Sequence, residues 1–127
     1  MSVTAWGHCA ELSGIDRRAK AYALMSGTTS FAEVAIANMP NMKAEEKTRY
    51  RNVVADIDPI LFVPQAAPAS IMFQTGRTEE HFGQEKSRSL ADAASEPKVV
   101  QWYDAGHALN EKARQDRDRW LVDELFR

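Results

Sequence analysis

Two short segments of the sequence hold the side chains best suited to chemistry. They are Gly76-Arg77-Thr78-Glu79-Glu80-His81 and Asp104-Ala105-Gly106-His107. Each follows a short apolar run typical of a buried strand, and the carboxyl ends of parallel strands meet at one edge of a sheet. A histidine that follows a glycine just past a strand is well placed to act as a general base. We therefore take His107 as the leading candidate for a catalytic base.

Each residue of these segments also has a simpler interpretation. His107 is equally compatible with a loop or helix-capping role, and Glu79 and Glu80 with solvated loop positions. His81 is by itself more typical of a surface histidine. Asp104, three residues before His107, could orient the imidazole, although an aspartate that ends a strand more often caps a turn.

Cys9 is the only cysteine of the chain, so an intrachain disulfide and a Cys-rich zinc site are excluded. It lies beside His8 in Gly7-His8-Cys9-Ala10-Glu11, and a cysteine next to a histidine could be a nucleophile or a metal ligand. A single small cysteine on a helix is more often a packing residue. Both interpretations of Cys9 stay open at this point.

Histidine and carboxylate side chains together also suit Zn²⁺ or Mn²⁺, and a bound metal lowers the pKa of its water toward ~7. The candidate ligands are His107, His81, Glu80 and His8, with nearby carboxylates. The spacing matches no known metal-site motif, and we expect no organic cofactor.

Three segments are expected to form the strands that position these residues: Ala19–Met25, Ser70–Gln74 and Lys98–Tyr103. Each is short, apolar and followed by a glycine, as interior strands are. Helical segments rather than hairpin turns separate them, which favours parallel strands joined by crossovers.

Apolar spacing, caps and proline stops predict the helices. They cover Thr4–Leu12, Phe31–Asn38, Lys43–Asp56, Glu85–Ala94 and the stretch from an Asn110 cap to about Phe126. Two of them carry an apolar face, formed by Tyr50, Val53, Val54 and Ile57 in one and by Ala113, Trp120, Leu121 and Leu125 in the other. Ser30 and Glu33 have the spacing of a capping box.

The chain is therefore expected to be a single α/β domain over residues 1–127, with a small three-stranded parallel sheet flanked by helices. Such a sheet leaves an apolar edge open, and an open edge favours pairing with a second strand. We expect a homodimer that completes the sheet.

Composition narrows the range of partners. The chain has 127 residues, of which 44% are hydrophobic and 27% charged, and its net charge is −2. The hydrophobic and charged fractions are typical of a globular protein. The slightly negative net charge is a poor electrostatic match to the negatively charged backbone of nucleic acid. No apolar run approaches the ~20 residues of a membrane span. The first residues lack the pattern of a secretory signal. We expect a cytoplasmic protein that acts on a small molecule and binds neither nucleic acid nor membrane.

Three segments together resemble parts of a known family. They are Ile15–Gly27, Ile71–Glu79 and Trp102–Asn110. From Gly14 onward the chain resembles the C-terminal half of an α/β-hydrolase, closest to the dienelactone-hydrolase-like and prolyl-oligopeptidase-like branches. The resemblance implies that the first segment leads into the strand after the nucleophile helix. It also implies that the other two carry the triad acid and the triad histidine, so Glu79 would be the acid, where the family usually has Asp, and His107 the base.

The sequence departs from that family at the nucleophile. It contains no complete G-x-S-x-G elbow. Cys9 occupies the central position of a partial match, but only six residues separate it from Asp16, too few for the family's nucleophile helix. Ser2 lies nearer the expected position. The upstream half of the family's sheet has no counterpart here, so the chain resembles a truncated α/β-hydrolase.

Three functional hypotheses follow. The first is a hydrolase of carboxylic esters or phosphoesters in which His107 and a carboxylate activate water, with or without a divalent metal. The second is an esterase that uses Cys9, or Ser2, as its nucleophile. The third is a non-catalytic dimeric fragment or binding module. We favour the first, because the positions of the base and the acid remain chemically competent.

Overall fold

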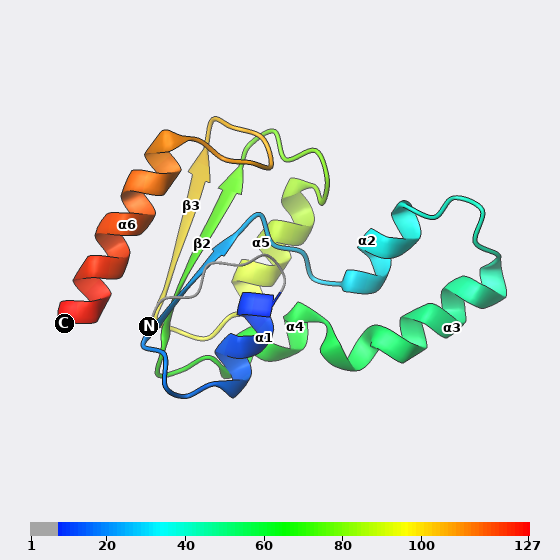
Figure 1. The fold of residues 1–127 in the computed structure, drawn as a ribbon, viewed down its shortest axis with the longest axis horizontal. Helices are drawn as coiled ribbons and strands as arrows, with labels where there is room; N and C mark the ends of the chain where they lie inside the picture. Colours follow the sequence, from blue (N-terminus) through cyan, green and yellow to red (C-terminus); the bar gives the residue numbers. More distant parts are fainter. Residues whose placement is uncertain (1–7) are drawn as a thin grey trace.

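A three-stranded parallel sheet forms the centre of the fold in the computed structural model, which describes residues 8–127 (Figure 1). Its strands are β1 (Ala21–Met25), β2 (Ser70–Gly76) and β3 (Lys98–Tyr103), in the order β1-β2-β3. The fold class expected from the sequence is therefore confirmed. The central strand, β2, is buried along its whole length, as an apolar strand with neighbours on both sides should be.

Helices cover both faces of this sheet (Figure 1). The α-helices are α1 (His8–Ile15), α2 (Phe31–Ala37), α3 (Ala44–Val54), α4 (Pro59–Phe62), α5 (Gln84–Ala93) and α6 (Glu111–Phe126). Two 3₁₀ turns, η1 (Ala55–Ile57) and η2 (Val63–Gln65), flank α4. The α1 and α5 helices pack against one face of the sheet, and α6 packs against the other.

Alternating side chains of the strands serve these two layers. Ile71 and Phe73 of β2 join Tyr22 and Leu24 of β1 in the main hydrophobic core, beneath α1 and α5. The next residue of β2, Gln74, is fully buried on the α6 side. Its amide donates to the hydroxyl of Tyr103 and to the carbonyl oxygen of Ala113, so this buried polar group is satisfied.

The end of the first helix differs from the prediction. The helix continues to Ile15, although we expected it to end at Leu12. Gly14 has a packing role instead, because a Cβ at this position would lie 2.7 Å from the carbonyl oxygen of Phe62 on α4. The predicted start at Thr4 lies outside the described residues. The short α4 helix was not predicted.

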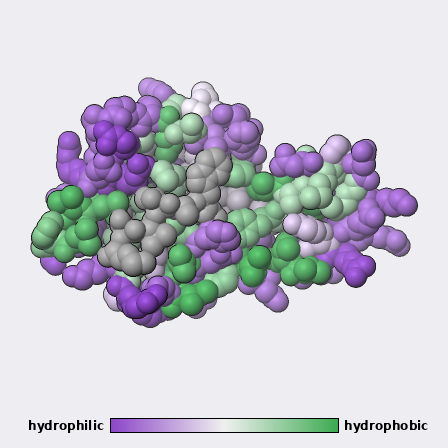
Figure 2. Space-filling view, viewed as in Figure 1, coloured by the Kyte–Doolittle hydropathy of each residue, from purple (hydrophilic) through white to green (hydrophobic). Residues whose placement is uncertain are grey.

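Residues 31–57, which we call the arm, extend sideways from the sheet (Figure 1). The second helix of the arm, α3, has the expected apolar face, but it buries none of its residues. Val53 is 72% exposed, and apolar side chains stand on the surface along this part of the molecule (Figure 2). A helical period in the sequence shows that an apolar face exists, without showing that anything covers it.

An ion pair joins the two helices of the arm. Glu33 follows Ser30 at capping-box spacing, and the backbone N–H of Glu33 donates to the Ser30 hydroxyl. Its carboxylate, however, accepts from Arg51 of α3 at 2.6 Å rather than from the backbone of the cap. This contact also holds the pKa of Glu33 below its usual value, because the guanidinium stabilises the charged carboxylate.

The last helix, α6, begins after the predicted cap, since the Asn110 side chain accepts from the backbone N–H of Ala113. Ala113 is fully buried, whereas Leu125 of the predicted stripe is 41% exposed. A buried polar contact lies near the end of α6 instead, where the hydroxyl of Ser70 donates to Glu124 at 2.8 Å.

No helix among residues 8–127 is long and apolar enough to cross a membrane. Within the same residues β1 pairs with β2 and forms one edge of the sheet. Pairing of two copies along that edge stays a prediction.

The loops that follow β2 and β3 are hydrogen-bonded to each other. Arg77 N–H donates to the carbonyl oxygen of Tyr103 at 2.8 Å, and Thr78 N–H donates to that of Ala105 at 3.2 Å. The loops approach so closely because Gly76 has no side chain. A Cβ there would overlap the carbonyl oxygens of Ala105 and Gly106.

Gly76→Ala should therefore separate the two loops. We expect a loss of roughly 1–3 kcal/mol in the free energy of unfolding, because backbone atoms rather than a flexible side chain occupy the space. Chemical denaturation would measure this loss. Ala108→Ser, at an exposed position of the loop after β3, is the control and should change stability by less than about 0.5 kcal/mol. An equally stable Gly76→Ala protein would contradict the close contact.

Candidate active site

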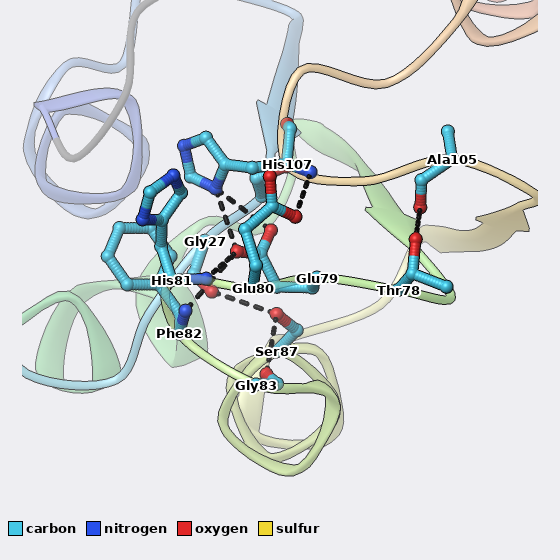
Figure 3. Close-up of polar contacts among 11 residues, drawn as sticks. Gly27, Thr78, Glu79, Glu80, His81, Phe82, Gly83, Ser87, Ala105 and His107 are labelled. Atoms are coloured by element: carbon cyan, nitrogen blue, oxygen red, sulfur yellow. Dashed lines mark hydrogen bonds and ion pairs between the residues drawn. The ribbon is translucent and has the colours of Figure 1, made fainter.

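His107 and Glu79 form a buried pair at the carboxyl edge of the sheet (Figure 3). The loop after β3 supplies His107, and the loop after β2 supplies Glu79. Nδ1 of His107 donates to both carboxylate oxygens of Glu79, at 2.9 Å each. Their side chains are 5% and 0% exposed. A carboxylate can only accept, so the neutral ring carries its proton on Nδ1, and Nε2 becomes the basic nitrogen.

The Glu79 carboxylate is also held by the backbone of its own loop. Oε1 accepts from the N–H groups of His81 and Phe82, at 2.8 and 3.2 Å. A buried carboxylate is costly unless it is hydrogen-bonded, and these donors together with the imidazole compensate its burial. The side chain that orients His107 is thus itself fixed in place.

The backbone of His107 is held at two further points. Its N–H donates to Oε2 of Glu80 at 2.9 Å, and its carbonyl oxygen accepts from the Ser26 hydroxyl at 2.7 Å. Gly106 leaves room for Glu80, because a Cβ there would lie 2.7 Å from the carboxylate. The backbone N–H of His107 lowers the pKa of Glu80 from its usual value, since this bond favours the charged carboxylate.

Ser26 connects the end of β1 to this site from a strained backbone conformation. Its φ is +49°, in the left-handed region that residues with a side chain seldom adopt. Its N–H donates to the carbonyl oxygen of Gln74 on β2 at 2.8 Å, and its buried hydroxyl reaches His107. The strained position thus joins all three strand ends at the histidine.

Two aromatic side chains lie against the imidazole. The rings of His81 and Phe82 meet the His107 ring edge to face, with centroids 4.6 and 5.1 Å away (Figure 3). These rings therefore partly shield the His107 side chain from water.

Two pockets adjoin these rings and share Val34 and Phe82 in their walls. The first, of about 400 Å³, includes His107 in its lining and has a partly polar wall, to which Glu33, Asn38, Glu80, His81 and Lys86 contribute. The second, of about 310 Å³, has mostly apolar walls; its lining includes Ser26, Gly27, Thr28 and Phe31. A small molecule bound at His107 would thus have a polar and an apolar space available.

The structure separates the three carboxylates that we considered as partners of His107. Glu79 contacts the ring and Glu80 contacts the backbone. Asp104 does neither among the contacts of the described residues: its side chain is 94% exposed and pairs with Arg77 at 3.2 Å. The orienting role considered for Asp104 falls to Glu79.

The two candidate residues of the first helix lie in different surroundings: Cys9 lies in the core and His8 lies at the surface. Cys9 is 1% exposed and belongs to the main hydrophobic core, as a packing cysteine would. His8 is exposed, pairs with Glu11 at 3.0 Å and lines the apolar pocket. Ser2 lies outside the described residues. The Cys9-dependent esterase stays a prediction.

The predicted metal ligands are only partly assembled. His107, His81 and Glu80 all line the larger pocket, whereas His8 lines the other one. Among residues 8–127, the structure gathers no group of three or more histidine, cysteine or carboxylate side chains in a ligating arrangement. Binding of Zn²⁺ or Mn²⁺ stays a prediction.

Sequence reasoning missed the roles of Ser26 and Phe82. Ser26 lies in the segment Ser26-Gly27-Thr28-Thr29, which follows a strand as the histidine loop does. Its contact with His107 spans 81 positions of the chain, however, and no local pattern encodes it. Phe82 follows His81 directly, and only the turn made around Glu79 brings it to the imidazole.

Comparison with known proteins supports the fold. No family model and no curated protein matches the sequence. Several solved structures do match the fold. The chain is similar to an acetyl xylan esterase from Paenibacillus sp. R4 (12% identity, TM-score 0.68), the enol-lactonase from Burkholderia xenovorans LB400 (16%, 0.59) and the α/β-hydrolase GrgF from Penicillium sp. sh18 (11%, 0.57).

The similarity covers 92%, 94% and 94% of this chain, but only 42%, 61% and 58% of those three proteins, in the same order. The chain therefore has an α/β-hydrolase-like fold that spans about half the length of the proteins it matches. At these identities the similarity establishes the fold alone.

The contact between the Glu80 carboxylate and the His107 backbone N–H should make the melting temperature of the protein depend on pH in the acid range. The pKa of Glu80 is lowered in the folded state, so its carboxylate stabilises the fold fully above the unfolded value of about 4.3. This contribution is lost as the pH falls through the folded pKa. Between about pH 5 and about pH 3, the melting temperature of Glu80→Gln should fall less than that of the wild type.

Thermal melts across this pH range would test the role of Glu80. Glu85→Gln, at an exposed position of α5, is the matched control and should follow the wild-type curve. Identical acid dependence in Glu80→Gln and the wild type would show that the carboxylate does not hold the histidine backbone.

Proposed function

We propose that this protein hydrolyses carboxylic esters, with His107 as general base and Glu79 as the carboxylate that orients it. The observation that carries the proposal is the buried bond from His107 Nδ1 to Glu79, which fixes the proton on one ring nitrogen and leaves the other basic. The fold shared with an esterase and a lactonase supports the choice of ester chemistry.

In the proposed reaction, Nε2 of His107 takes a proton from the attacking group, which is water in the simplest form. The oxygen of that water bonds to the ester carbonyl carbon. As the tetrahedral intermediate collapses, the bond from carbon to the alcohol oxygen breaks, and the imidazolium returns its proton to the leaving alcohol. Glu79 stabilises the imidazolium between these two steps.

The burial of the pair supports its role as a unit. Glu79 is shielded from water and receives two backbone N–H donors, so it cannot swing away from the ring without leaving those donors unpaired. A base whose position is fixed before substrate arrives needs less rearrangement during the reaction.

A metal-assisted variant of the same proposal would place Zn²⁺ or Mn²⁺ near His107, His81 and Glu80, which line one pocket. Such an ion would extend the range of substrates to phosphoesters, because it generates hydroxide near neutral pH and offsets phosphoryl charge. The branch within the α/β-hydrolases, dienelactone-hydrolase-like or prolyl-oligopeptidase-like, belongs to the proposal as well.

Turnover of 4-nitrophenyl acetate should depend on both members of the pair. His107→Ala and Glu79→Gln should each lower kcat by roughly 10²- to 10⁴-fold, because one removes the base and the other its orienting carboxylate. Glu85→Gln is the carboxylate control and should retain wild-type kcat. Melting curves would establish that each variant is folded. Unchanged turnover in His107→Ala would refute the proposal.

The same assay, run with 4-nitrophenyl phosphate and with a chelator, separates the alternatives. Turnover lost on chelation and restored by Zn²⁺ or Mn²⁺ would establish the metal-assisted variant. Folded wild-type protein that turns over neither substrate would favour the non-catalytic binding module.

Cys9→Ala addresses the remaining alternative. Because Cys9 is 1% exposed in the core, we expect this variant to be less stable but to keep its kcat at temperatures where it is folded. A folded Cys9→Ala protein without turnover would instead support the Cys9-dependent esterase.

A further inference from the structure

Oγ1 of Thr28, a buried polar atom next to the candidate active site, has no hydrogen-bond partner in the described part of the chain. Thr28 lies just after β1 and is 5% exposed. A buried hydroxyl that makes no hydrogen bond keeps the full cost of its desolvation, so a residue such as valine would be favoured there on stability alone. This observation suggests that the hydroxyl is used when a ligand is present.

Thr28 lines the apolar pocket of about 310 Å³. The other walls of this pocket are largely apolar, with Phe31 and Val34 from the arm and Phe82 from the loop after β2. The Phe82 ring contacts the His107 ring at 5.1 Å, and Ser26, which also lines the pocket, donates to the His107 backbone. Two residues of the pocket wall thus contact the proposed base, although His107 itself does not line this pocket.

The pocket at His107 and the neighbouring apolar pocket differ in polarity, so they offer a bound ester two distinct environments. Lys86 and Glu80 line the larger pocket, which suits a polar or hydrated group. The apolar walls around Thr28 suit a hydrocarbon group that offers one hydrogen-bonding atom. At about 310 Å³, the apolar pocket is large enough for a short acyl chain.

We infer that the apolar pocket binds the acyl group of the ester and that Thr28 Oγ1 hydrogen-bonds an oxygen carried on that acyl chain. The preferred substrates are then esters of short hydroxy acids, with the polar alcohol part in the larger pocket. Rotation of χ1 from one staggered rotamer to the next can move the threonine oxygen into the position that the methyl group now holds. The oxygen, shielded from water in this structure, can thus turn toward a ligand. The turnover of such esters rests on the proposed function, whereas binding of the acid does not.

Binding of two acids that differ by one hydroxyl tests this inference without catalysis. We would titrate the wild-type protein with butyrate and with 3-hydroxybutyrate and follow backbone amide signals by NMR. The hydroxy acid should bind roughly 2- to 10-fold more tightly, which is the net effect expected of one hydrogen bond. The largest shifts should fall on Gly27, Thr28 and Phe82.

Two variants of Thr28 separate a binding role from a structural one. Thr28→Val keeps the shape and removes the hydroxyl, so it should abolish the preference for 3-hydroxybutyrate while leaving the melting temperature equal or higher. Thr28→Ser keeps the hydroxyl and should retain the preference. A hydroxyl with a merely structural role would instead lower the melting temperature of Thr28→Val.

The inference would be overturned by equal binding of the two acids to the wild type, by a preference that survives in Thr28→Val, or by shifts that map to another surface. Parallel assays with the 4-nitrophenyl esters of both acids keep the two proposals apart. A Thr28-dependent binding preference without ester turnover would retain the acyl pocket and refute the proposed hydrolysis. Ester turnover without a Thr28-dependent binding preference would retain the proposed hydrolysis and refute the acyl pocket.

Discussion

The burial of one carboxylate, that of Glu79, determines the geometry of the whole candidate site. A charged group removed from water must be compensated by donors, and Glu79 finds them in the imidazole of His107 and in two backbone N–H groups of its own loop. The requirement bends the loop after β2 around the carboxylate and ties it to the loop after β3. Glu80, the neighbouring residue, is thereby brought to the backbone N–H of the same histidine.

Much of this arrangement is predictable from the sequence. The three strands are legible because each is a short apolar run closed by glycine, and parallel strands must bring their carboxyl ends together. The candidates Glu79 and His107 follow from that rule. The choice among Glu79, Glu80 and Asp104 does not, because it depends on which carboxylate the turn hides from water. Asp104 is the nearest of the three to His107 in sequence, yet its side chain is 94% exposed.

Other features escape sequence reasoning because they depend on partners far along the chain. The strained Ser26 and the Thr28 hydroxyl, which has no hydrogen-bond partner among residues 8–127, lie within a short polar segment that resembles an ordinary turn. The apolar face of α3 is a case in which the sequence pattern is correct but the expected burial is not. Its period is correct, but the structure leaves Val53 exposed because the arm extends away from the sheet. Periodicity describes one helix, and burial requires a second surface.

The bond from Ser26 to His107, between residues 81 positions apart, has a consequence for how the site comes into being. Contacts of such long sequence separation form late in folding, because the chain must first lose the entropy of closing a large loop. The backbone of His107 is held from Ser26 only once β1, β2 and β3 lie side by side, so no partly folded intermediate that lacks β3 can hold the proposed base in place. Placement of the proposed base and completion of the topology are therefore the same event in this chain.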